Sequence, residues 1–199
     1  PELASLRELL IKRTGGNPFF IEEIVRSLAE TGALLGSRGA YTLGTPIDAV
    51  RVPSTVRTVL AERVDRLPAA EKQLLQTAAV IGVVVLVRLL RAVTGLPDNE
   101  LRRYLFNLQA AEFIFESNLF PELEYTFKHA LVDEVVYSAL LHDRRITLHG
   151  SIVRALEQIG GDHRADHIEA LAYHAAQAEL WEAAVRYSRQ AAAKAMSRS

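Results

Sequence analysis

Cysteine is absent from this chain of 199 residues, and methionine and tryptophan occur once each. Without cysteine the chain forms no disulfide and offers no thiolate to a metal ion, which favours an intracellular setting. An excess of one charge is also missing, because 23 lysines and arginines stand against 24 aspartates and glutamates, for a net charge of −1. Proteins that bind polyanions over their whole surface are usually basic, so this balance argues against such a partner.

Long apolar runs are missing too. The longest, residues 78–87, contains Gly82 and is followed by Arg88, and it is much shorter than the roughly 18 residues that a membrane span requires. No signal-peptide pattern is visible. We therefore expect a cytoplasmic protein that makes no membrane contact. Because the chain begins at Pro1 inside an expected helix and stops at Ser199 inside or just after another, we expect it to be part of a longer protein.

The motif G-x-x-x-x-G-K-[ST], whose loop cradles nucleotide phosphates, does not occur, and no predicted strand ends in acidic residues that could hold magnesium. We therefore predict that this chain alone does not hydrolyse ATP, contains no catalytic residues and carries no cofactor by itself.

What the sequence does contain is a succession of amphipathic helices. Leucines at helical spacing occupy residues 2–12, and Gly15 and Gly16 then interrupt the helix. Asn17 suits an N-cap, and Pro18 suits the first position of the next helix, where its missing N–H costs nothing. Further helices are predicted over residues 56–67, 68–81, 84–93, 97–111, 129–141, 143–159, 165–178 and 181–197.

Two segments have the character of β-hairpins instead. Residues 33–43 place apolar arms around a glycine-rich turn, and residues 113–127 contain "FIFES" and "LEYTF" joined by "NLFPE". Three helices followed by a two-stranded wing are the layout of a winged helix, so the second hairpin predicts such a domain.

The last two predicted helices are typical of the first unit of a helical-repeat array such as TPR. Ala184, Tyr187 and Ala191 fit the second helix of such a unit, although Ser188 stands where an aromatic residue is usual. We therefore predict a mainly α fold. Its expected parts are a helical lid segment with a short hairpin (1–50), a winged-helix domain (51–142), and a helical linker with the start of TPR-like repeats (143–199).

Five segments, in this order, resemble the region that follows the ATPase core in STAND-type predicted ATPases, bacterial relatives of the AAA+ and NB-ARC switch proteins. The resemblance extends over most of the chain, from about residue 5 to residue 198. The segments are "GGNPFFIEEIVRSLAETGAL", "VPSTVRTVLAERVDRLPAAEKQLLQTAAVIG", "LQAAEFIFE", "YTFKHALVDEVVYSALL" and "LHGSIVRALE".

This resemblance implies a regulatory role in signal transduction or transcription. The family is often fused to adenylate or guanylate cyclase domains or to LuxR-type regulators, and the full-length parent would be an ATPase. ATP or ADP would be bound mainly by the missing core, and this chain would read the nucleotide state. The implied partners are that core and the proteins that the helical repeats bind.

The resemblance also implies three nucleotide contacts. Gly16 and Pro18 match the family's Gly-x-Pro segment, whose proline lies beside the adenine and offers a flat apolar surface. His129, flanked by Lys128 and Ala130, matches the histidine of the Met-His-Asp motif, which reaches the phosphates. His129 is expected where a strand enters a helix, so free N–H groups and the imidazole would both favour an anion. From the residues alone, an ordinary helix start and a helix-capping histidine remain alternatives.

Two other functions remain open. A winged helix can bind nucleic acid through the helix predicted over residues 97–111. Its polar candidates are Asn99, Arg102, Arg103, Asn107 and Gln109, whereas Asp98, Glu100 and Glu112 argue against DNA. The remaining alternative is a helical scaffold that binds proteins and has no nucleotide role.

Several other side chains are given structural roles. His163, Asp166 and His167 have the spacing of metal ligands, but no further ligand is fixed nearby, and we predict no metal site. Phe19 and Phe20 are predicted in the core, and Trp181 as the anchor between the last two helices. The adjacent Glu22 and Glu23 are predicted to be solvated or to complement the helix dipole.

Overall fold

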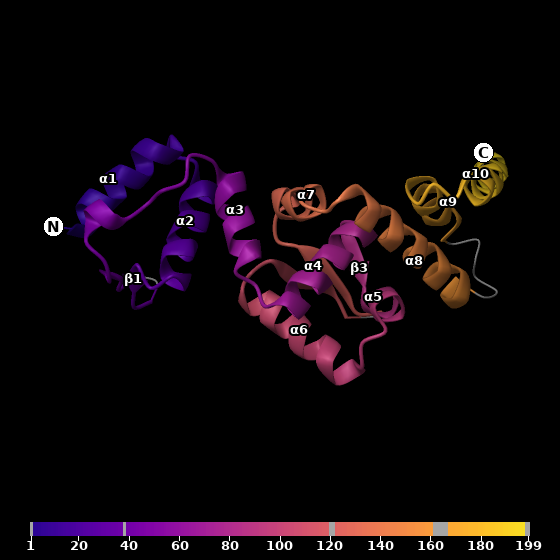
Figure 1. Ribbon diagram of the computed structural model, residues 1–199, viewed down its shortest axis with the longest axis horizontal. Coiled ribbons are helices and arrows are strands. Elements are labelled where there is room, and N and C mark those ends of the chain that lie inside the picture. Colours follow the sequence, from indigo (N-terminus) through magenta and orange to yellow (C-terminus); the bar gives the residue numbers. More distant parts are fainter. Residues whose placement is uncertain (1, 38, 120–121, 161–166, 198–199) are drawn as a thin grey trace. The chain divides into compact units, whose positions relative to one another are not determined.

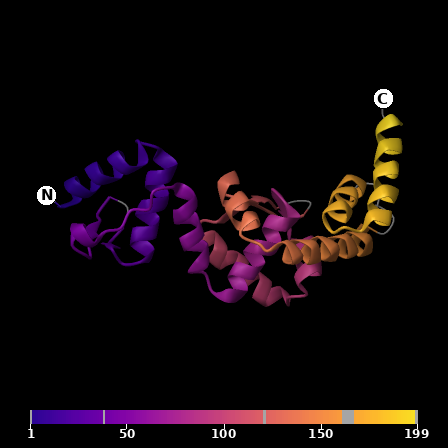
Figure 2. The same cartoon turned by 45° about the horizontal axis from the view of Figure 1, so that its top comes forward.

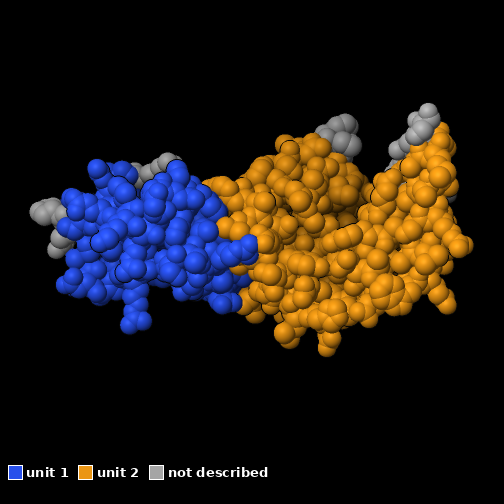
Figure 3. Space-filling view, turned by 90° about the horizontal axis from the view of Figure 1, so that it is seen from above, with its two compact units in different colours: residues 1–67 blue, residues 68–199 orange. Residues whose placement is uncertain are grey.

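A computed structural model describes residues 2–37, 39–119, 122–160 and 167–197 of the chain (Figure 1). The described residues form a mainly α structure with two small antiparallel sheets, which confirms the predicted class. The chain divides into two compact units, residues 1–67 and 68–199, shown in Figure 3. No helix of the described residues is both long and apolar enough to cross a membrane.

Unit 1 contains three helices around a short hairpin. Its core joins the apolar faces of α1 and α2 to Val59 of α3. The predicted boundary after residue 50 therefore falls inside this unit, where α3 packs on α2. Its elements are α1 (Glu2–Thr14), α2 (Pro18–Glu30), β1 (Leu34–Leu35), β2 (Thr42–Leu43), a 3-10 helix (Ile47–Ala49) and α3 (Val56–Asp65).

The predicted helix start at Asn17 is confirmed. Asn17 is the N-cap of α2, and its side-chain oxygen accepts a hydrogen bond from Phe20 N at 3.1 Å. Phe20, Ile24 and Leu28 then lie on one face of α2 and are buried. Because these residues recur at helical spacing, the cap and the stripe together determine which face of α2 enters the core.

Unit 2 begins with the expected winged helix. Its sheet has the order β3-β5-β4, with Val85 opposite Tyr125 and Phe115 opposite Thr126. The predicted hairpin of residues 113–127 is thus present as β4 and β5. The elements are α4 (Ala69–Ile81), β3 (Val84–Leu86), α5 (Val87–Thr94), α6 (Asp98–Ala110), β4 (Ile114–Asn118) and β5 (Glu124–Phe127).

The helix predicted over residues 84–93 is wrong in its first turn. Residues 84–86 form the strand β3, which pairs with β5 about forty positions later in the chain. The valines of this run are β-branched and suit a strand, and the sheet supplies the partner that fixes them there. The helix α5 begins at Val87.

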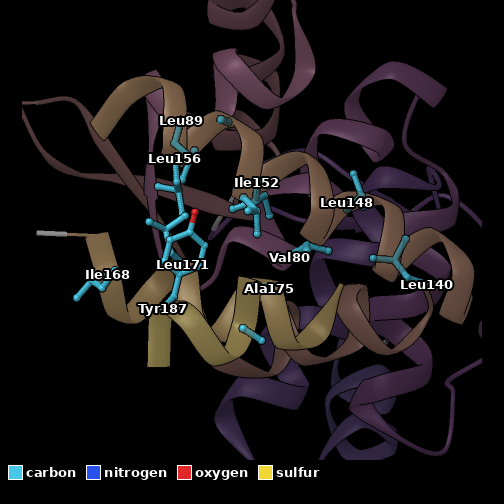
Figure 4. Packing of buried hydrophobic residues seen from close by; sticks show 13 residues of the cluster. Val80, Leu89, Leu140, Leu148, Ile152, Leu156, Ile168, Leu171, Ala175 and Tyr187 are labelled. Atoms are coloured by element: carbon cyan, nitrogen blue, oxygen red, sulfur yellow. The ribbon is translucent and has the colours of Figure 1, made fainter. Parts of the chain in front are cut away.

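Four helices complete the described part of unit 2 (Figures 1 and 2). Buried side chains join them to the winged helix in one core. The central helix, α8, packs against α4 and α5 and also against α9. Figure 4 shows Leu156 of α8 between Leu89 of α5 and Leu171 of α9, with Ile152 on the side towards Val80 of α4. The predicted boundary after residue 142 therefore lies at the first residue of a helix common to both parts. The four are α7 (Ala130–Ser138), α8 (His142–Gly160), α9 (Ile168–Gln177) and α10 (Trp181–Met196).

The anchor between the last two helices is Tyr187, and the prediction of Trp181 in this role is wrong. Trp181 is the first residue of α10 and is 65% exposed, whereas Tyr187 is 3% exposed. The hydroxyl of Tyr187 donates a hydrogen bond to the carboxylate of Glu157 on α8. Tyr187 lies about two turns into α10, where side chains of α8 and α9 pack around it. Trp181, at the start of the helix, is not buried by these helices.

Candidate functional site

The corner between α1 and α2 is held in one conformation by local hydrogen bonds. Gly15 and Gly16 have φ values of 60° and 77°, the left-handed region that favours glycine. Thr14 Oγ1 donates to the carbonyl oxygen of Leu10 at 2.7 Å and lies 3.3 Å from Gly16 N, which donates to it. Pro18 follows at the first position of α2 and is exposed. The corner therefore presents the ring of Pro18 to the outside from a fixed backbone.

An apolar hollow lies in the same unit, between α1, α2 and the hairpin. Its volume is about 300 Å³, and nearly all of its surface is carbon. Leu3 and Ile11, which line it, are 43% and 46% exposed. Unit 1 thus carries both an exposed proline corner and an apolar concavity, and exposed apolar surface of this kind often marks a site of contact with another molecule.

A cluster of charges that the sequence analysis missed joins α2 to α3; we call it the arginine cluster. Arg63 is 2% exposed, and its guanidinium contacts the carboxylates of Glu23 and Glu30. Arg66 adds hydrogen bonds to Glu30 at 3.2 Å and to Ser27 Oγ at 2.9 Å. The prediction that Glu23 is solvated is wrong, because Glu23 is 1% exposed.

The electrostatics of Arg63 are those of a buried but fully paired charge. Burial lowers its pKa, but hydrogen bonds and charge from Glu30 and Glu23 more than offset this, so the pKa of Arg63 is raised above its usual value. The guanidinium fork fits two carboxylates at once, which a lysine would not do equally well. This cluster is suited to holding helices together.

His129 stands where the sequence placed it, between β5 and α7. It is the N-cap residue of α7, with extended backbone angles of −141° and 140°, and its carbonyl accepts a hydrogen bond from Val132 N at 2.9 Å. The alternative of a helix-capping side chain is not realised, since the imidazole makes no capping hydrogen bond. The side chain is half-buried. The neighbouring Lys128 forms an ion pair with Glu112, so its charge is largely neutralised by a residue of the same domain.

The three predicted contact residues divide between the units. Gly16 and Pro18 lie together at the corner of unit 1, and His129 lies in unit 2. Of the suggested metal ligands, His163 and Asp166 lie outside the described residues, and His167 is the N-cap of α9. Within the described parts of the chain, no three His, Asp or Glu side chains are grouped as a metal site requires.

A second cluster that the sequence analysis missed joins α7, α8 and α9; we call it the histidine cluster. The hydroxyl of Tyr137 lies 3.2 Å from His149 Nε2, and His149 Nδ1 lies 2.8 Å from His174 Nδ1. His149 and His174 are 0% and 3% exposed. Because two ring nitrogens share one hydrogen bond, at least one of the two imidazoles is neutral.

Charged and aromatic groups surround the histidine cluster. Burial and the nearby charge of Arg145 lower the pKa of His149 to about 4, and burial together with His149 lowers the pKa of His174 to about 4. Burial raises the pKa of Asp133 to about 6. The ring of Tyr173 packs edge-on against both histidines, with centroids 5.9 and 5.1 Å away. The cluster is therefore held in its neutral form at pH 7.

No family model matches the chain. The chain is 31% identical over 189 residues to an uncharacterized protein of Rhizobium meliloti (strain 1021). The alignment covers 94% of this chain but 18% of that protein, so the chain spans less than a fifth of the length of this relative.

Proposed function

We propose that this chain is the regulatory arm of a STAND-type ATPase, in which unit 1 serves as a lid and unit 2 passes the nucleotide state to helical repeats. One observation carries the proposal. His129 begins α7, and α7 is hydrogen-bonded through Tyr137 and His149 to His174 on α9. A ligand that pulls on His129 would thus act on a helix already connected to the C-terminal helices.

Unit 1 supports the proposal independently. The exposed ring of Pro18 stands on a backbone fixed by Asn17 and two left-handed glycines, which suits contact with an adenine. The apolar hollow beside α1 and α2 suits packing of the lid on an ATPase core. The much longer relative has room for such a core, and also for repeats and an effector such as a nucleotide cyclase or a transcription regulator.

In this proposal ATP or ADP is bound mainly by the core, in the bacterial cytoplasm. The core of the same polypeptide is one partner, and proteins recognised by the repeats are the others. This chain positions the nucleotide from the lid and the winged helix, and it performs no chemistry itself.

The test uses the full-length protein and its affinity for ADP. We expect His129→Ala to weaken ADP binding about ten- to a hundredfold, because it removes one hydrogen bond to a charged group. Pro18→Ala should weaken it a fewfold, since less apolar surface meets the base. His142→Ala is the matched control, because this histidine is exposed and lies 3.5 Å from the carboxylate of Glu179, which is also exposed.

Wild-type affinity and wild-type basal activity in both variants would contradict the proposal. A helical scaffold without a nucleotide role would then explain the molecule better, because its contacts to partners do not involve His129 or Pro18.

Nucleic-acid binding by the winged helix is the second candidate, and one observation favours it. Two of the acidic residues that argue against DNA are neutralised by basic residues of the same domain. Asp98 pairs with Arg91 at 2.9 Å, and Glu112 pairs with Lys128. The exposed Arg102 and Arg103 then dominate the outer face of α6. Asn107 is not available for this role, because its side-chain amide donates to Glu71 at 2.6 Å.

Duplex DNA binding as a function of salt decides this second candidate. A phosphate-contacting protein loses affinity steeply as salt rises, and Arg103→Ala should then weaken binding to all sequences alike. A flat salt dependence, or no binding at low salt, would rule it out.

A further inference from the structure

The winged helix contains a pocket that the proposed nucleotide contacts do not use. It lies between α5, α6 and β5 and has a volume of about 340 Å³. Its floor is apolar and its rim is charged, and His129 is not part of either. The floor consists of Val87, Leu101, Leu105, Leu123 and Tyr125, and the rim of Arg88, Arg91, Asp98, Arg102 and Glu122.

The charges of the rim favour an anion. Three arginines stand against two carboxylates, an excess of one positive charge. Arg88 pairs with Glu122 at 3.0 Å and Arg91 with Asp98 at 2.9 Å, while Arg102 forms no ion pair within the described parts of the chain. The two pairs are about half-exposed, and exposed pairs contribute little to stability, so an incoming anion can replace either carboxylate.

The helix ends at the pocket add to this field. Val87 is the first residue of α5 and Asp98 is the first residue of α6, and both line the pocket. The positive ends of two helix dipoles therefore lie at the same rim as the three guanidinium groups. Arg91, first, and then Arg102 lower the pKa of Asp98 below its usual value, which is a sign of the same positive field.

The apolar floor of the pocket favours a ligand that is larger than an inorganic ion and partly apolar. A cavity of about 340 Å³ is in the range of small-molecule sites, and its five apolar side chains would leave the space around a bare phosphate empty. An arginine fork matches phosphate oxygens two at a time, and three forks suit a dianion. The ligand that fits both parts has a flat or compact apolar body and a phosphate head.

We propose that this pocket binds a small organic phosphate, with the phosphate held by Arg102 together with Arg88 and Arg91 and the apolar body resting on Leu105, Leu123 and Tyr125. The site is separate from the proposed nucleotide contacts and does not depend on them. In a regulatory protein it would give a small molecule a direct means of acting on the winged helix.

The experiment titrates the 199-residue chain with phenyl phosphate by calorimetry and follows the backbone amides by NMR. We expect saturable binding with a dissociation constant below about 1 mM, and shifts at residues 87–91, 101–105 and 123–125. Arg102→Ala should weaken binding at least about tenfold, because it removes a charge-assisted hydrogen bond. Arg103→Ala is the control, since this neighbouring exposed arginine does not line the pocket and should bind phenyl phosphate as the wild type does.

Three further probes distinguish the sources of the signal. Benzoate tests whether a carboxylate head suffices, inorganic phosphate tests whether the floor matters, and a short DNA duplex tests for a phosphate backbone. Benzoate is expected to bind more weakly than phenyl phosphate, and inorganic phosphate more weakly still. The proposal is overturned by equal affinity for inorganic phosphate and phenyl phosphate, by wild-type binding in Arg102→Ala, or by DNA binding that both arginine variants weaken while phenyl phosphate does not bind.

Discussion

The two units each contain a buried polar cluster, and the clusters hold their helices together by different physics. In unit 1, Arg63 is a full charge matched by the carboxylates of Glu23 and Glu30. In unit 2, His149 and His174 are buried with their pKa values lowered to about 4, so the contact between α8 and α9 depends on neutral rings. The charged cluster is robust to small changes in pH near neutrality, and the neutral cluster is sensitive to acid.

The largest effect should come from Arg63→Met, which removes the buried guanidinium and leaves the buried Glu23 with only the ion pair to Arg26, at 3.1 Å. Removing one partner of a buried ion pair costs about 3–5 kcal/mol, so unit 1 should lose most of its stability. Hydrogen exchange of α2 and α3 peptides, measured by mass spectrometry, should become fast, while exchange in α8 and α9 stays as in the wild type. Unchanged protection of α2 would mean that the hydrophobic core of unit 1 dominates and that the cluster adds little.

The corresponding change in unit 2 is His174→Leu, which keeps the volume but removes the partner of His149 Nδ1. A buried polar group left without its hydrogen-bond partner costs about 1–3 kcal/mol, a smaller loss than that expected for Arg63→Met. We expect urea unfolding of unit 2 to shift to lower concentration, and α9 to exchange faster than α4. His142→Ala, at an exposed histidine of α8, should change neither quantity. If His174→Leu unfolds at the same urea concentration as His142→Ala, the hydrogen bond between His149 and His174 does not stabilise the contact between α8 and α9.

The pH dependence of the stability of unit 2 tests the difference between the charged cluster and the neutral one. The unfolded histidines bind protons near pH 6.5 and the folded ones near 4, so their contribution is complete above about pH 6.5 and is lost as the pH falls towards 4. Asp133 acts in the opposite direction, because burial raises its pKa in the folded state to about 6, above its usual value of 3.8, and its protonation favours the folded state as the pH falls. Arg145, Tyr137 and Tyr173 also face the pair.

We therefore expect unit 2 to lose on the order of 1–2 kcal/mol between pH 7 and pH 5, with the two histidines titrating as a coupled pair. Asp133→Asn should make this fall steeper, and His174→Leu should make it shallower. The measurement is urea unfolding at a series of pH values, with exchange in unit 1 as the internal reference. A stability of unit 2 that rises on acidification would show that Asp133 outweighs the histidines.

The smallest effect should come from Arg66→Ala, at the outer edge of the arginine cluster. Its side chain is 37% exposed, and its partner Glu30 is 33% exposed, so the pair is screened by water. Exposed pairs are worth about 0–1 kcal/mol, and we expect a change in that range for the unfolding of unit 1. A loss as large as that of Arg63→Met would show that the cluster acts as one unit and that burial does not separate its members.

Local signals in the sequence predicted local structure well. Asn17 determines the start of α2 through a hydrogen bond from Phe20 N, three residues later, and Pro18 does so through its fixed φ. The hairpin of β4 and β5 connects neighbouring segments. Contacts between distant positions were missed. Arg63 and Glu23 are 40 residues apart, His149 and His174 are 25 apart, and β3 finds its partner in β5. Nothing in the sequence around Glu23 distinguishes a buried carboxylate from the exposed Glu22 beside it.

The candidate site follows the same division. The placement of Pro18 at the first position of a helix and of His129 at a strand-to-helix junction is confirmed, because both depend on neighbouring residues. Their contact with a nucleotide remains a prediction from the family resemblance. The pocket of the winged helix was not predicted at all, since it combines side chains from α5, α6 and β5 that meet only in the folded chain.

The position of α8 in a single core restricts how this region can be recombined. Its Ile152 and Leu156 pack against both the winged helix and α9, so separating the chain at residue 142 would expose apolar surface on both fragments. A chimera that joins helical repeats of another protein to this winged helix should therefore keep α8 and α9 of this chain and place the junction after α10. Natural recombination faces the same restriction, so α8 and α9 are expected to stay with the winged helix in related chains.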